Sequence, residues 1–382
     1  MKAVTFVMVS ILCILMMAAS PVLAADTIKV GAILAVTGPA SFLGAPEAKT
    51  LEMMTEEINR KGGIMGKKID LIIKDSGASP EKALSFAKQL IEEDKVLAII
   101  GPSTSGETMK IKNVAEEGKT ILLSCAAAEV IVNPVAKYVF KTPQNDSFAV
   151  IKIFDQMKKM KISKIGVLSS NTGFGQAGKA QIEKMAPEHQ IQIVANEVYD
   201  KAATDLTAEV TKVKASGAQA IVNWSIEPAQ AIVIKNARQI GFKGPIFQSH
   251  GFGNIKYVQA AGPAADGVIF PAGRLLVANE LPKSNKQKAV LMAYKKDYER
   301  RFKEDASTFG GHAYDAMLIL TKAIEKAHST NEEAVRNAIE NLKGVVGTGG
   351  IFNFSPQDHN GLSIGSFEML TVKKGKFVPL GK

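Results

Sequence analysis

Three hydroxyl side chains lie where a predicted helix begins, in the run Gly101-Pro102-Ser103-Thr104-Ser105-Gly106-Glu107-Thr108. An apolar strand precedes this run, and the first N–H groups of a helix lack partners within it and attract anions. A nucleotide-binding P-loop would need a lysine where Glu107 stands, which excludes that kind of loop. We therefore predict that this helix start binds one carboxylate through Ser105 and its neighbouring backbone amides, with Ser103 and Thr104 also at the ligand site and helix capping as the alternative role.

A glycine-rich run, Gly173-Phe174-Gly175-Gln176-Ala177-Gly178, matches the dinucleotide-binding fingerprint, and Glu197 lies at the end of the next predicted strand. Residues 170–172 separate the run from the preceding strand, which loosens the tight turn that brings a backbone close to a pyrophosphate. A flexible loop before a helix explains the glycines better. An NAD-dependent oxidoreductase is the weakest alternative that remains.

Very small side chains end another apolar strand, in the run Ser124-Cys125-Ala126-Ala127-Ala128. Side chains of this size allow main-chain groups to approach a ligand, although simple packing would also explain them. The same site has larger candidate residues, which would be ordinary core or surface residues if two lobes did not face each other: Phe174, Trp224, His250 and Phe309.

The sequence contains no recognisable catalytic or metal-binding set. It has no His-Glu-x-x-His helix, no Gly-x-Ser-x-Gly elbow and no histidine spacing typical of a metal site. Outside the N-terminal apolar run, Cys125 stands alone and cannot form an internal disulfide. We therefore expect no enzymatic activity, no cofactor and no bound metal.

The first residues have the order of an export signal that is cleaved. Lys2 precedes an apolar run from Val4 to Met17, and small residues follow up to Ala24. The apolar run is shorter than the roughly 20 residues needed to span a bilayer. We predict a signal peptide at residues 1–24, cleavage before Ala25, and a periplasmic mature protein.

The formal net charge is +10, but the lysines are scattered along the chain. The densest group comprises Lys158, Lys159, Lys161 and Lys164, which is typical of a solvated helix face. Nucleic-acid binding would require a basic stripe with stacking aromatic residues, and an exported protein seldom meets nucleic acid. We expect no nucleic-acid partner.

Strands and helices alternate along the chain in two successive series. The first series has strands at 28–35, 68–75, 96–100 and 120–124, and the second has strands at 164–169, 190–199, 220–224 and 245–248. Helices are predicted between them, and three more at 285–303, 313–327 and 332–342. Strands that alternate with helices indicate parallel sheets covered on both faces. The predicted fold class is α/β, with two doubly wound lobes.

The whole mature chain resembles the leucine/isoleucine/valine-binding protein family of ABC-transporter solute receptors. The resemblance is carried by Ile28-Lys29-Val30-Gly31, Thr37-Gly38-Pro39, Ile58-Asn59, Gly62-Gly63-Ile64-Met65-Gly66, the strand leading to Gly101, Gly175, Pro228 and Gly349-Gly350-Ile351-Phe352-Asn353-Phe354. It implies a type I periplasmic binding protein, with two lobes joined by a hinge of three crossovers. Lobe 1 would comprise residues 26–143 and 271–350, and lobe 2 residues 144–270 and 351–382.

The resemblance also implies how a ligand is held. In that family, a serine hydroxyl and nearby amides of the first lobe hold a carboxylate, and the matching positions here are Ser105 and Ala128. A turn carbonyl, matching Ala126, holds the ammonium together with a threonine hydroxyl and a glutamate of the second lobe. Here Ala128 stands at the threonine position and His250 at the glutamate position. Two of the three ammonium partners are therefore absent.

Aromatic positions of the family also differ: Leu43, Phe174 and Ile226 stand where tyrosines are typical, and Trp224 and Phe309 add apolar surface. Burying an ammonium beside an alanine and an imidazole would cost on the order of several kcal/mol. We therefore predict an aromatic or branched aliphatic acid without an α-amino group, with His250 donating to a ligand oxygen. The alternative is a hydrophobic or branched-chain amino acid, with Glu227 or Asp146 replacing the missing glutamate.

The expected mechanism is capture by closure of the two lobes. The ligand binds first to the lobe of Ser105, and the second lobe then closes over it. A membrane permease of an ABC importer would recognise the closed form, and we expect the binding protein to be a monomer. A sensory receptor domain of the same fold is the alternative from a different class, which we rank lower because no output segment follows Lys382.

Overall fold

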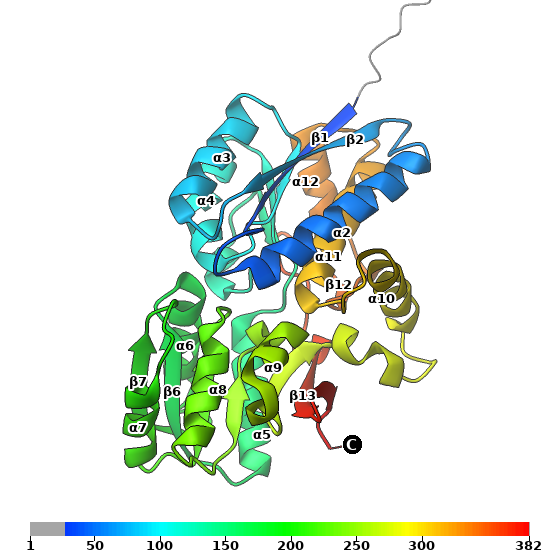
Figure 1. The fold of residues 1–382 in the computed structure, drawn as a ribbon. Coiled ribbons are helices and arrows are strands. Elements are labelled where there is room, and N and C mark those ends of the chain that lie inside the picture. The colour runs from blue at the N-terminus through cyan, green and yellow to red at the C-terminus, as the bar shows by residue number, and fades with distance from the viewer. Residues whose placement is uncertain (1–26, 382) are drawn as a thin grey trace, which may run out of the picture.

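The structure, a computed structural model, describes residues 27–381, and the predicted signal peptide at residues 1–24 lies outside them. The chain folds into two lobes, one above the other in Figure 1, each built around its own sheet. The N-terminal strand lies in the upper lobe and the C-terminus in the lower lobe. The predicted pair of α/β lobes is therefore present.

The sheet of the first lobe has five parallel strands in the order β2-β1-β3-β4-β5. Its strands are β1 (Thr27–Leu34), β2 (Lys68–Asp75), β3 (Ala98–Ile100), β4 (Ile121–Ser124) and β5 (Val139–Lys141). Its helices are α2 (Ser41–Arg60), α3 (Pro80–Glu92), α4 (Ser105–Glu117), α11 (Thr308–Ala327) and α12 (Glu332–Glu340). One hydrophobic cluster packs α2, α11 and α12 against one sheet face, and another packs α3 and α4 against the opposite face.

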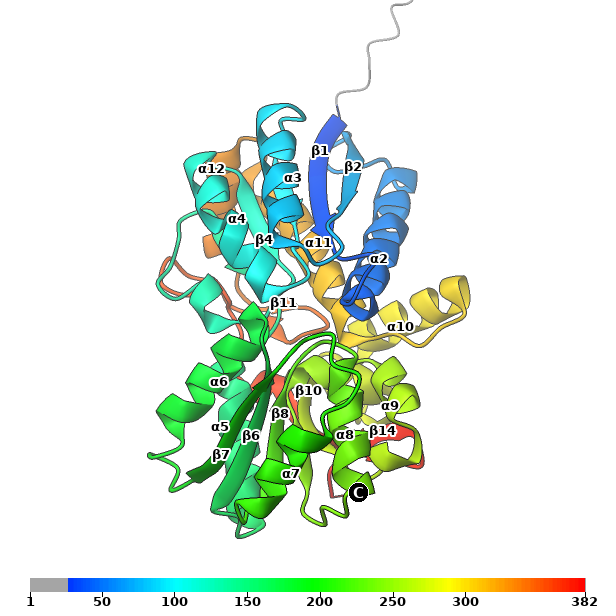
Figure 2. The same ribbon diagram turned by 60° about the vertical axis from the view of Figure 1, so that its left-hand side comes forward.

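The sheet of the second lobe has seven strands in the order β14-β13-β10-β9-β8-β6-β7. Its strands are β6 (Lys164–Ser170), β7 (Gln192–Tyr199), β8 (Ala220–Trp224), β9 (Ile246–Gln248), β10 (Ile269–Gly273), β13 (Phe367–Lys373) and β14 (Lys376–Pro379). The helices of this lobe are α5 (Asp146–Lys159), α6 (Gly173–Met185), α7 (Thr207–Ala215), α8 (Ala229–Gln239) and α9 (Ile255–Ala261). Figure 2 shows this lobe below the first, with β6, β7 and β8 side by side. Only β13 and β14 add antiparallel pairings.

Burial explains why the apolar runs form central strands. All five residues of β8 are buried, as are the last six of the seven residues of β6. Strands covered by helices on both faces read as continuous apolar runs. The C-terminal ends of β3, β4, β6 and β8 lead into the loops that face the other lobe. The parallel arrangement therefore brings these loops together between the lobes.

The crossovers between lobes lie later in the chain than predicted at two places. β10 (Ile269–Gly273) pairs with β9 and β13 of the second sheet, so the second lobe extends past the expected limit at residue 270. β12 (Ile351–Phe352) pairs with β11 (Val345–Val346), and Phe352 and Phe354 pack in the core of the first lobe. Leu362 packs in the same core and His359 bonds to Val139 O, so the last crossover follows residue 362 rather than residue 350. These limits depend on tertiary pairing, which the local sequence does not reveal.

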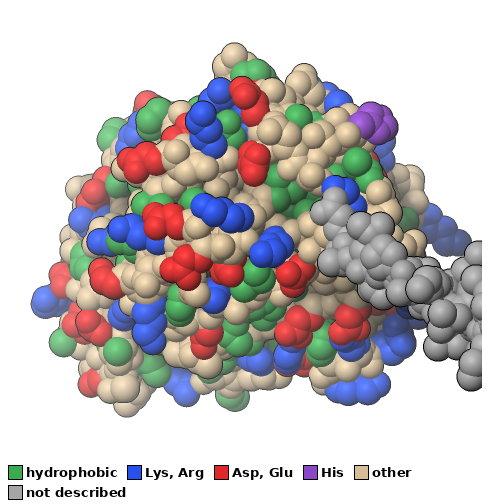
Figure 3. Space-filling model, turned by 90° about the horizontal axis from the view of Figure 1, so that it is seen from above, with side chains coloured by type: hydrophobic (Ala, Val, Ile, Leu, Met, Phe, Trp, Pro, Cys, Tyr) green, Lys and Arg blue, Asp and Glu red, His purple; other side chains and the backbone are tan. Residues whose placement is uncertain are grey.

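Charged side chains of both signs are mixed on the face of the molecule drawn in Figure 3. No basic stripe gathers on this face. No helix among residues 27–381 is long and apolar enough to cross a membrane. In the same part of the chain, no cluster of three or more histidine, cysteine or acidic side chains could hold a metal ion.

Candidate ligand-binding site

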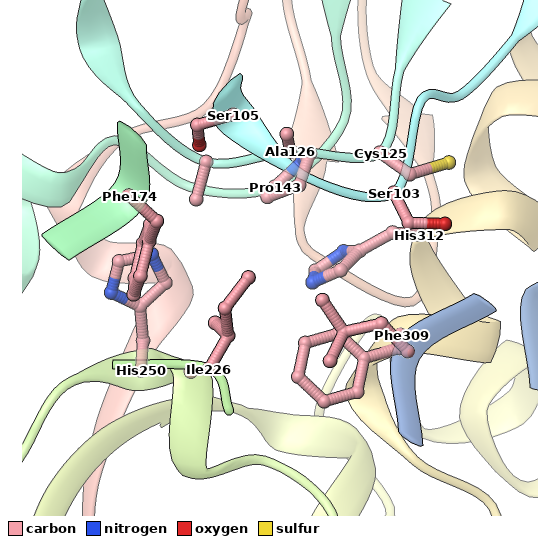
Figure 4. Close-up of a pocket in the computed structure, with 13 residues that line it drawn as sticks. Ser103, Ser105, Cys125, Ala126, Pro143, Phe174, Ile226, His250, Phe309 and His312 are labelled. Carbon is pink, nitrogen blue, oxygen red and sulfur yellow. The ribbon is translucent and has the colours of Figure 1, made fainter. Parts of the chain in front are cut away.

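A narrow cavity lies between the lobes, with about 320 Å³ of space that no atom fills, part of which is open to solvent. Its lining comes from both lobes: Leu43, Ser103, Ser105, Cys125, Ala126, Ala127, Pro143, Phe174, Ile226, His250, Gly251, Phe309 and His312. Figure 4 shows these side chains around the cavity, with the first lobe above and Ile226 and His250 rising from the second lobe. Nine of the twelve predicted site residues belong to this lining, and Thr104, Ala128 and Trp224 do not.

The two lobes are in contact around the cavity. Asn254 Nδ2 of the second lobe donates a hydrogen bond to Phe42 O at the start of α2, over 2.8 Å. The Thr308 N–H at the start of α11 donates to Gly253 O over 3.1 Å. Leu43 and Phe309 of the first lobe pack with the hydrophobic cluster of the second lobe. The structure therefore has the closed arrangement of the lobes.

Ser105 points its hydroxyl into the cavity from the first residue of α4 (Figure 4). Its Oγ accepts a hydrogen bond from the Ala128 N–H over 3.3 Å, which leaves the hydroxyl proton free for a ligand. The first N–H groups of α4 have no partners within the helix. Ser105 and the N–H groups ahead of Glu107, whose own N–H is capped by Thr104, can together bind a carboxylate oxygen. Ala128 contributes through its backbone, behind the lining.

Ser103 and Thr104 have partners within the first lobe. Ser103 Oγ accepts from the Ala35 N–H over 3.0 Å and forms a short hydrogen bond to Glu47 Oε2. Thr104 is the N-cap of α4, because its Oγ1 accepts from the Glu107 N–H over 3.4 Å and donates to Glu107 Oε2 over 2.5 Å. The capping alternative therefore describes Thr104, and Ser103 has its hydroxyl directed at Glu47.

Glu47 is a fully buried acid on α2 that sequence reasoning missed. Its Oε1 atom has no hydrogen-bond partner, and burial raises its pKa to about 8. Gly44 makes this position possible, since a Cβ at Gly44 would lie 2.2 Å from the Ala35 carbonyl carbon. The helix therefore lies close enough to the end of β1 for Glu47 to reach Ser103. At neutral pH the carboxyl group is uncharged.

His250 belongs to the short helix η2 (His250–Phe252) of the second lobe and is 7% exposed. Three aromatic rings surround it edge-on, at centroid distances of 5.4 Å for Phe174, 5.7 Å for Trp224 and 5.5 Å for Phe367. Neither ring nitrogen has a hydrogen-bond partner. Burial, with the nearby Lys141 charge and His312, lowers the pKa of His250 to about 3. The imidazole is therefore neutral.

His312 lines the cavity from α11 of the first lobe and was not predicted. Figure 4 shows its ring pointing into the cavity. Its Nδ1 has no partner, and burial lowers its pKa to about 3. The sequence placed the start of this helix at Ala313, whereas Ser307 caps a helix that begins at Thr308. Gly310 and Gly311 lie in the first turn, and because glycine is unfavourable in helices, the sequence did not indicate a helix start there.

The apolar wall of the cavity consists of Leu43, Phe174, Ile226 and Phe309. Trp224 lies behind this wall, at a centroid distance of 5.8 Å from Phe174. Its indole fits over Gly178, where a Cβ would lie 2.0 Å from the indole nitrogen. Trp224 therefore supports Phe174 and His250 from behind and does not line the cavity.

Lys141 is completely buried directly behind the lining. Its Nζ donates to Ala127 O over 3.0 Å and to Pro143 O over 2.9 Å. Burial lowers the pKa of Lys141 and raises that of Asp146, while the two opposite charges attract each other. Both cavity histidines lie within the electrostatic reach of this lysine. A lysine whose charged form is disfavoured by burial and favoured by nearby negative charge therefore lies beside the cavity.

The two acids proposed to replace a missing glutamate lie outside this lining. Glu227 lines a second, outer cavity, and its Oε2 accepts from the Ser225 hydroxyl over 2.6 Å and the Ile226 N–H over 3.2 Å. Asp146 Oδ1 accepts from the backbone N–H groups of Glu129 and Ser147. Glu227 is therefore held by partners within the second lobe, whereas Asp146 Oδ2 is buried without a hydrogen-bond partner.

The sequence of the chain matches a family model described as periplasmic binding protein, over residues 27–376. A curated relative from Pseudomonas aeruginosa, named leucine-, isoleucine-, valine-, threonine-, and alanine-binding protein, is 26% identical over 325 residues, which is 84% of each chain. A Brucella melitensis relative, named Leu/Ile/Val-binding protein homolog 3, is also 26% identical and covers 92% of this chain and 93% of its own length.

Solved structures with the same fold match nearly the whole chain. An extracellular ligand-binding receptor from Rhodopseudomonas palustris HaA2 has a TM-score of 0.87 at 28% identity, covering 93% of this chain and 100% of its own. The branched-chain amino acid transporter substrate binding protein LivJ from Streptococcus pneumoniae, in complex with isoleucine, has a TM-score of 0.81 at 26% identity. This match covers 92% of the chain described here and 98% of the other.

Proposed function

Since the chain belongs to the periplasmic binding protein family, and within it to the leucine/isoleucine/valine-binding type of ABC-transporter solute receptors, we propose that its ligand is a small carboxylate without an α-amino group. An aromatic or branched aliphatic acid would lie between the lobes. Ser105 and the start of α4 would hold its carboxylate, and Phe174, Ile226, Phe309 and Leu43 its apolar part.

The observation that carries this proposal is the absence of any acid from the thirteen residues that line the inner cavity. An α-ammonium group needs anionic or carbonyl oxygen partners when it is buried, because desolvation of an unpaired charge is costly. Ala126 could offer a carbonyl from the first lobe. On the second lobe, the lining offers Phe174, Ile226, His250 and Gly251, of which none carries a negative charge.

Lys141 adds a second reason, because a ligand carboxylate near it would favour its charged form, whereas an α-ammonium group would oppose that form. Its ammonium group binds the carbonyl oxygens of Ala127 and Pro143, two residues that line the cavity. Charges in a low-dielectric interior interact more strongly than charges in water. A ligand with a free carboxylate and no ammonium would gain this attraction without a compensating repulsion.

A hydrophobic amino acid is the second candidate, and the relatives favour it. The names of the Pseudomonas and Brucella relatives specify leucine, isoleucine and valine, and the Streptococcus structure contains isoleucine. Binding of an amino acid here would require Glu227 to leave its partners Ser225 and Ile226 and reach the inner cavity. A ligand without an amino group would bind without this rearrangement.

The proposed cellular role follows from the family. After cleavage of the signal peptide before Ala25, the monomer would capture its ligand in the periplasm and close over it. The closed lobes would then deliver the ligand to the permease of an ABC importer. No enzymatic step is part of this role.

Calorimetry of ligand-stripped protein tests the proposal. Leucine, valine and phenylalanine would be titrated beside benzoate, hydroxybenzoates and branched aliphatic acids. We expect one or more of the amine-free acids to bind at micromolar concentration and the amino acids to bind at least about tenfold more weakly. Micromolar leucine binding without any response to the amine-free acids would overturn the proposal, and turnover of any ligand would contradict a pure binding role.

A further inference from the structure

Two imidazoles from opposite lobes face the same cavity. His312 comes from the first turns of α11 in the first lobe, and His250 from η2 in the second lobe. Both line the inner cavity, and each is 7% exposed. Figure 4 shows the two rings on opposite sides of the cavity, with Ile226 between them. A ligand group that contacts both rings would therefore link the two lobes.

These imidazoles have hydrogen-bonding capacity that the described protein does not use. Both nitrogens of His250 and Nδ1 of His312 lack a partner. A neutral imidazole offers one N–H donor and one acceptor nitrogen, and a buried group of either kind is unfavourable without a partner. Both rings are neutral near pH 7, because burial lowers the pKa of each to about 3. A purely hydrocarbon ligand surface would leave this capacity unused.

The residues packed around His250 offer its ring nitrogens no hydrogen-bond partner, whereas the cavity can hold one. Phe174, Trp224 and Phe367 pack edge-on around the ring, and rings of phenylalanine accept no conventional hydrogen bond. Trp224 could only donate, and its own Nε1 also lacks a partner. The aromatic packing holds the imidazole at the cavity wall, where a ligand atom can supply the missing interaction.

We propose that His250 and His312 recognise a hydroxyl group of the ligand, with one imidazole donating to the hydroxyl oxygen and the other accepting its proton. A hydroxyl group is the simplest group that can do both, whereas a keto or ether oxygen only accepts. The ligand class is therefore a hydroxylated carboxylic acid. The inference uses the carboxylate site of the proposed function but does not depend on the absence of the amino group.

Three ligand pairs test this inference: in two of them one member has an added hydroxyl, and in the third a hydroxyl replaces a methyl group. The pairs are para-hydroxybenzoate with benzoate, α-hydroxyisocaproate with isocaproate, and threonine with valine, each titrated by calorimetry into the full mature protein. In at least one pair, we expect the hydroxylated member to bind about tenfold to a hundredfold more tightly, because its partner leaves buried nitrogens unpaired. The ratio should fall to about one in His250→Phe and in His312→Phe, which keep a ring and lose the nitrogens.

His189→Phe is the matched control, because His189 lies on the second lobe outside the cavity and packs on Phe154. This control variant should leave the affinity ratio of every ligand pair as it is in the wild type. Equal affinities within all three pairs, or a hydroxyl preference that survives both cavity variants, would overturn the inference. A preference seen for threonine over valine alone would support it while contradicting the amine-free ligand, so the two proposals fail separately. Binding of no member of any pair counts against both.

A measurement without ligand covers the case in which the variants bind nothing. Thermal unfolding of ligand-free His250→Phe should occur at a higher temperature than that of the wild type, because the substitution removes two buried nitrogens without partners. A purely structural histidine would instead lose stability on substitution. A lower unfolding temperature in this variant would therefore contradict a role reserved for the ligand.

Discussion

Gly173 at the start of α6 touches Gly106 at the start of α4 across the cleft, so closely that a Cβ on Gly173 would lie 2.7 Å from Gly106 Cα. These residues belong to opposite lobes. The reverse relationship is looser, because a Cβ on Gly106 would lie 3.7 Å from the nearest atom of Gly173, its backbone nitrogen. Closure therefore tolerates a methyl group on one side of this contact and not on the other.

Gly173→Ala is therefore expected to weaken ligand binding, while Gly106→Ala binds almost normally. The added methyl group would overlap with backbone atoms in the closed form only, at a cost of about 1–3 kcal/mol, or about tenfold to a hundredfold in affinity. Calorimetry with the tightest ligand of the panel measures the loss. Small-angle X-ray scattering of the liganded variant should show a larger radius of gyration. Equal losses in the two variants would contradict the asymmetry.

Glu47→Gln should stabilise the protein increasingly as the pH rises. The pKa of buried Glu47 is raised from 4.5 to about 8, so the folded protein binds this proton more tightly than the unfolded chain does. The stability contribution of the group is full below about pH 4.5 and is lost as the pH rises to about 8. Glutamine never ionises and avoids this loss, on the order of 3–5 kcal/mol above about pH 8.

Chemical denaturation of wild type and Glu47→Gln at about pH 5 and about pH 8.5 measures this difference. Glu52→Gln, at an exposed position of the same helix, is the control and should leave the pH dependence as in the wild type. A constant difference in the free energy of unfolding between Glu47→Gln and wild type at both pH values would contradict the buried, protonated state of Glu47.

Lys141→Met should weaken carboxylate binding about tenfold or more, because the ammonium group that a bound carboxylate would attract is lost. Removing one partner of a buried pair leaves Asp146 without its opposite charge, so the double variant Lys141→Met with Asp146→Asn is measured in parallel. Both should lose affinity for benzoate and isocaproate. If the double variant binds as the wild type does, the charge of Lys141 has no part in ligand recognition.

His250→Glu should shift the preference from amine-free acids toward leucine. The substitution supplies a carboxylate at the cavity that can bind an α-ammonium, a pairing worth about 1.5–3 kcal/mol for a charged hydrogen bond. Affinities for leucine and isocaproate are compared by calorimetry in the wild type and the variant. His189→Glu adds the same charge outside the cavity and should change neither affinity. An unchanged ratio in His250→Glu would contradict the assigned position of His250.

Much of the fold could be predicted, because parallel strands buried on both faces produce continuous apolar runs that sequence alone reveals. β1, β2, β6 and β8 begin and end within a residue of their predicted limits. The short strand β5 and helix α9 were missed, since each spans few residues and has no distinct periodicity. The limits of the lobes also depend on tertiary pairing, as β10 and β12 demonstrate.

The sequence could predict the site residues whose position follows from the strand or helix in which they lie. Ser105, Phe174, Ile226 and His250 follow strand ends or begin helices, and the parallel fold brings such positions together. Glu47 and His312 gave no local signal, because their importance depends on burial against segments far away in the sequence. For Trp224 the sequence indicated an apolar ligand contact, whereas the structure has it one layer behind the cavity.

The central proposal is that the ligand lacks an α-amino group, and one pair of molecules tests it most directly. Leucine and isocaproate differ only by the α-amino group, so their dissociation constants for the ligand-stripped wild-type protein isolate its contribution. The cavity lining without an acid predicts that isocaproate binds more tightly than leucine, by about tenfold or more. Tighter binding of leucine would contradict the account and identify the protein as a receptor for amino acids.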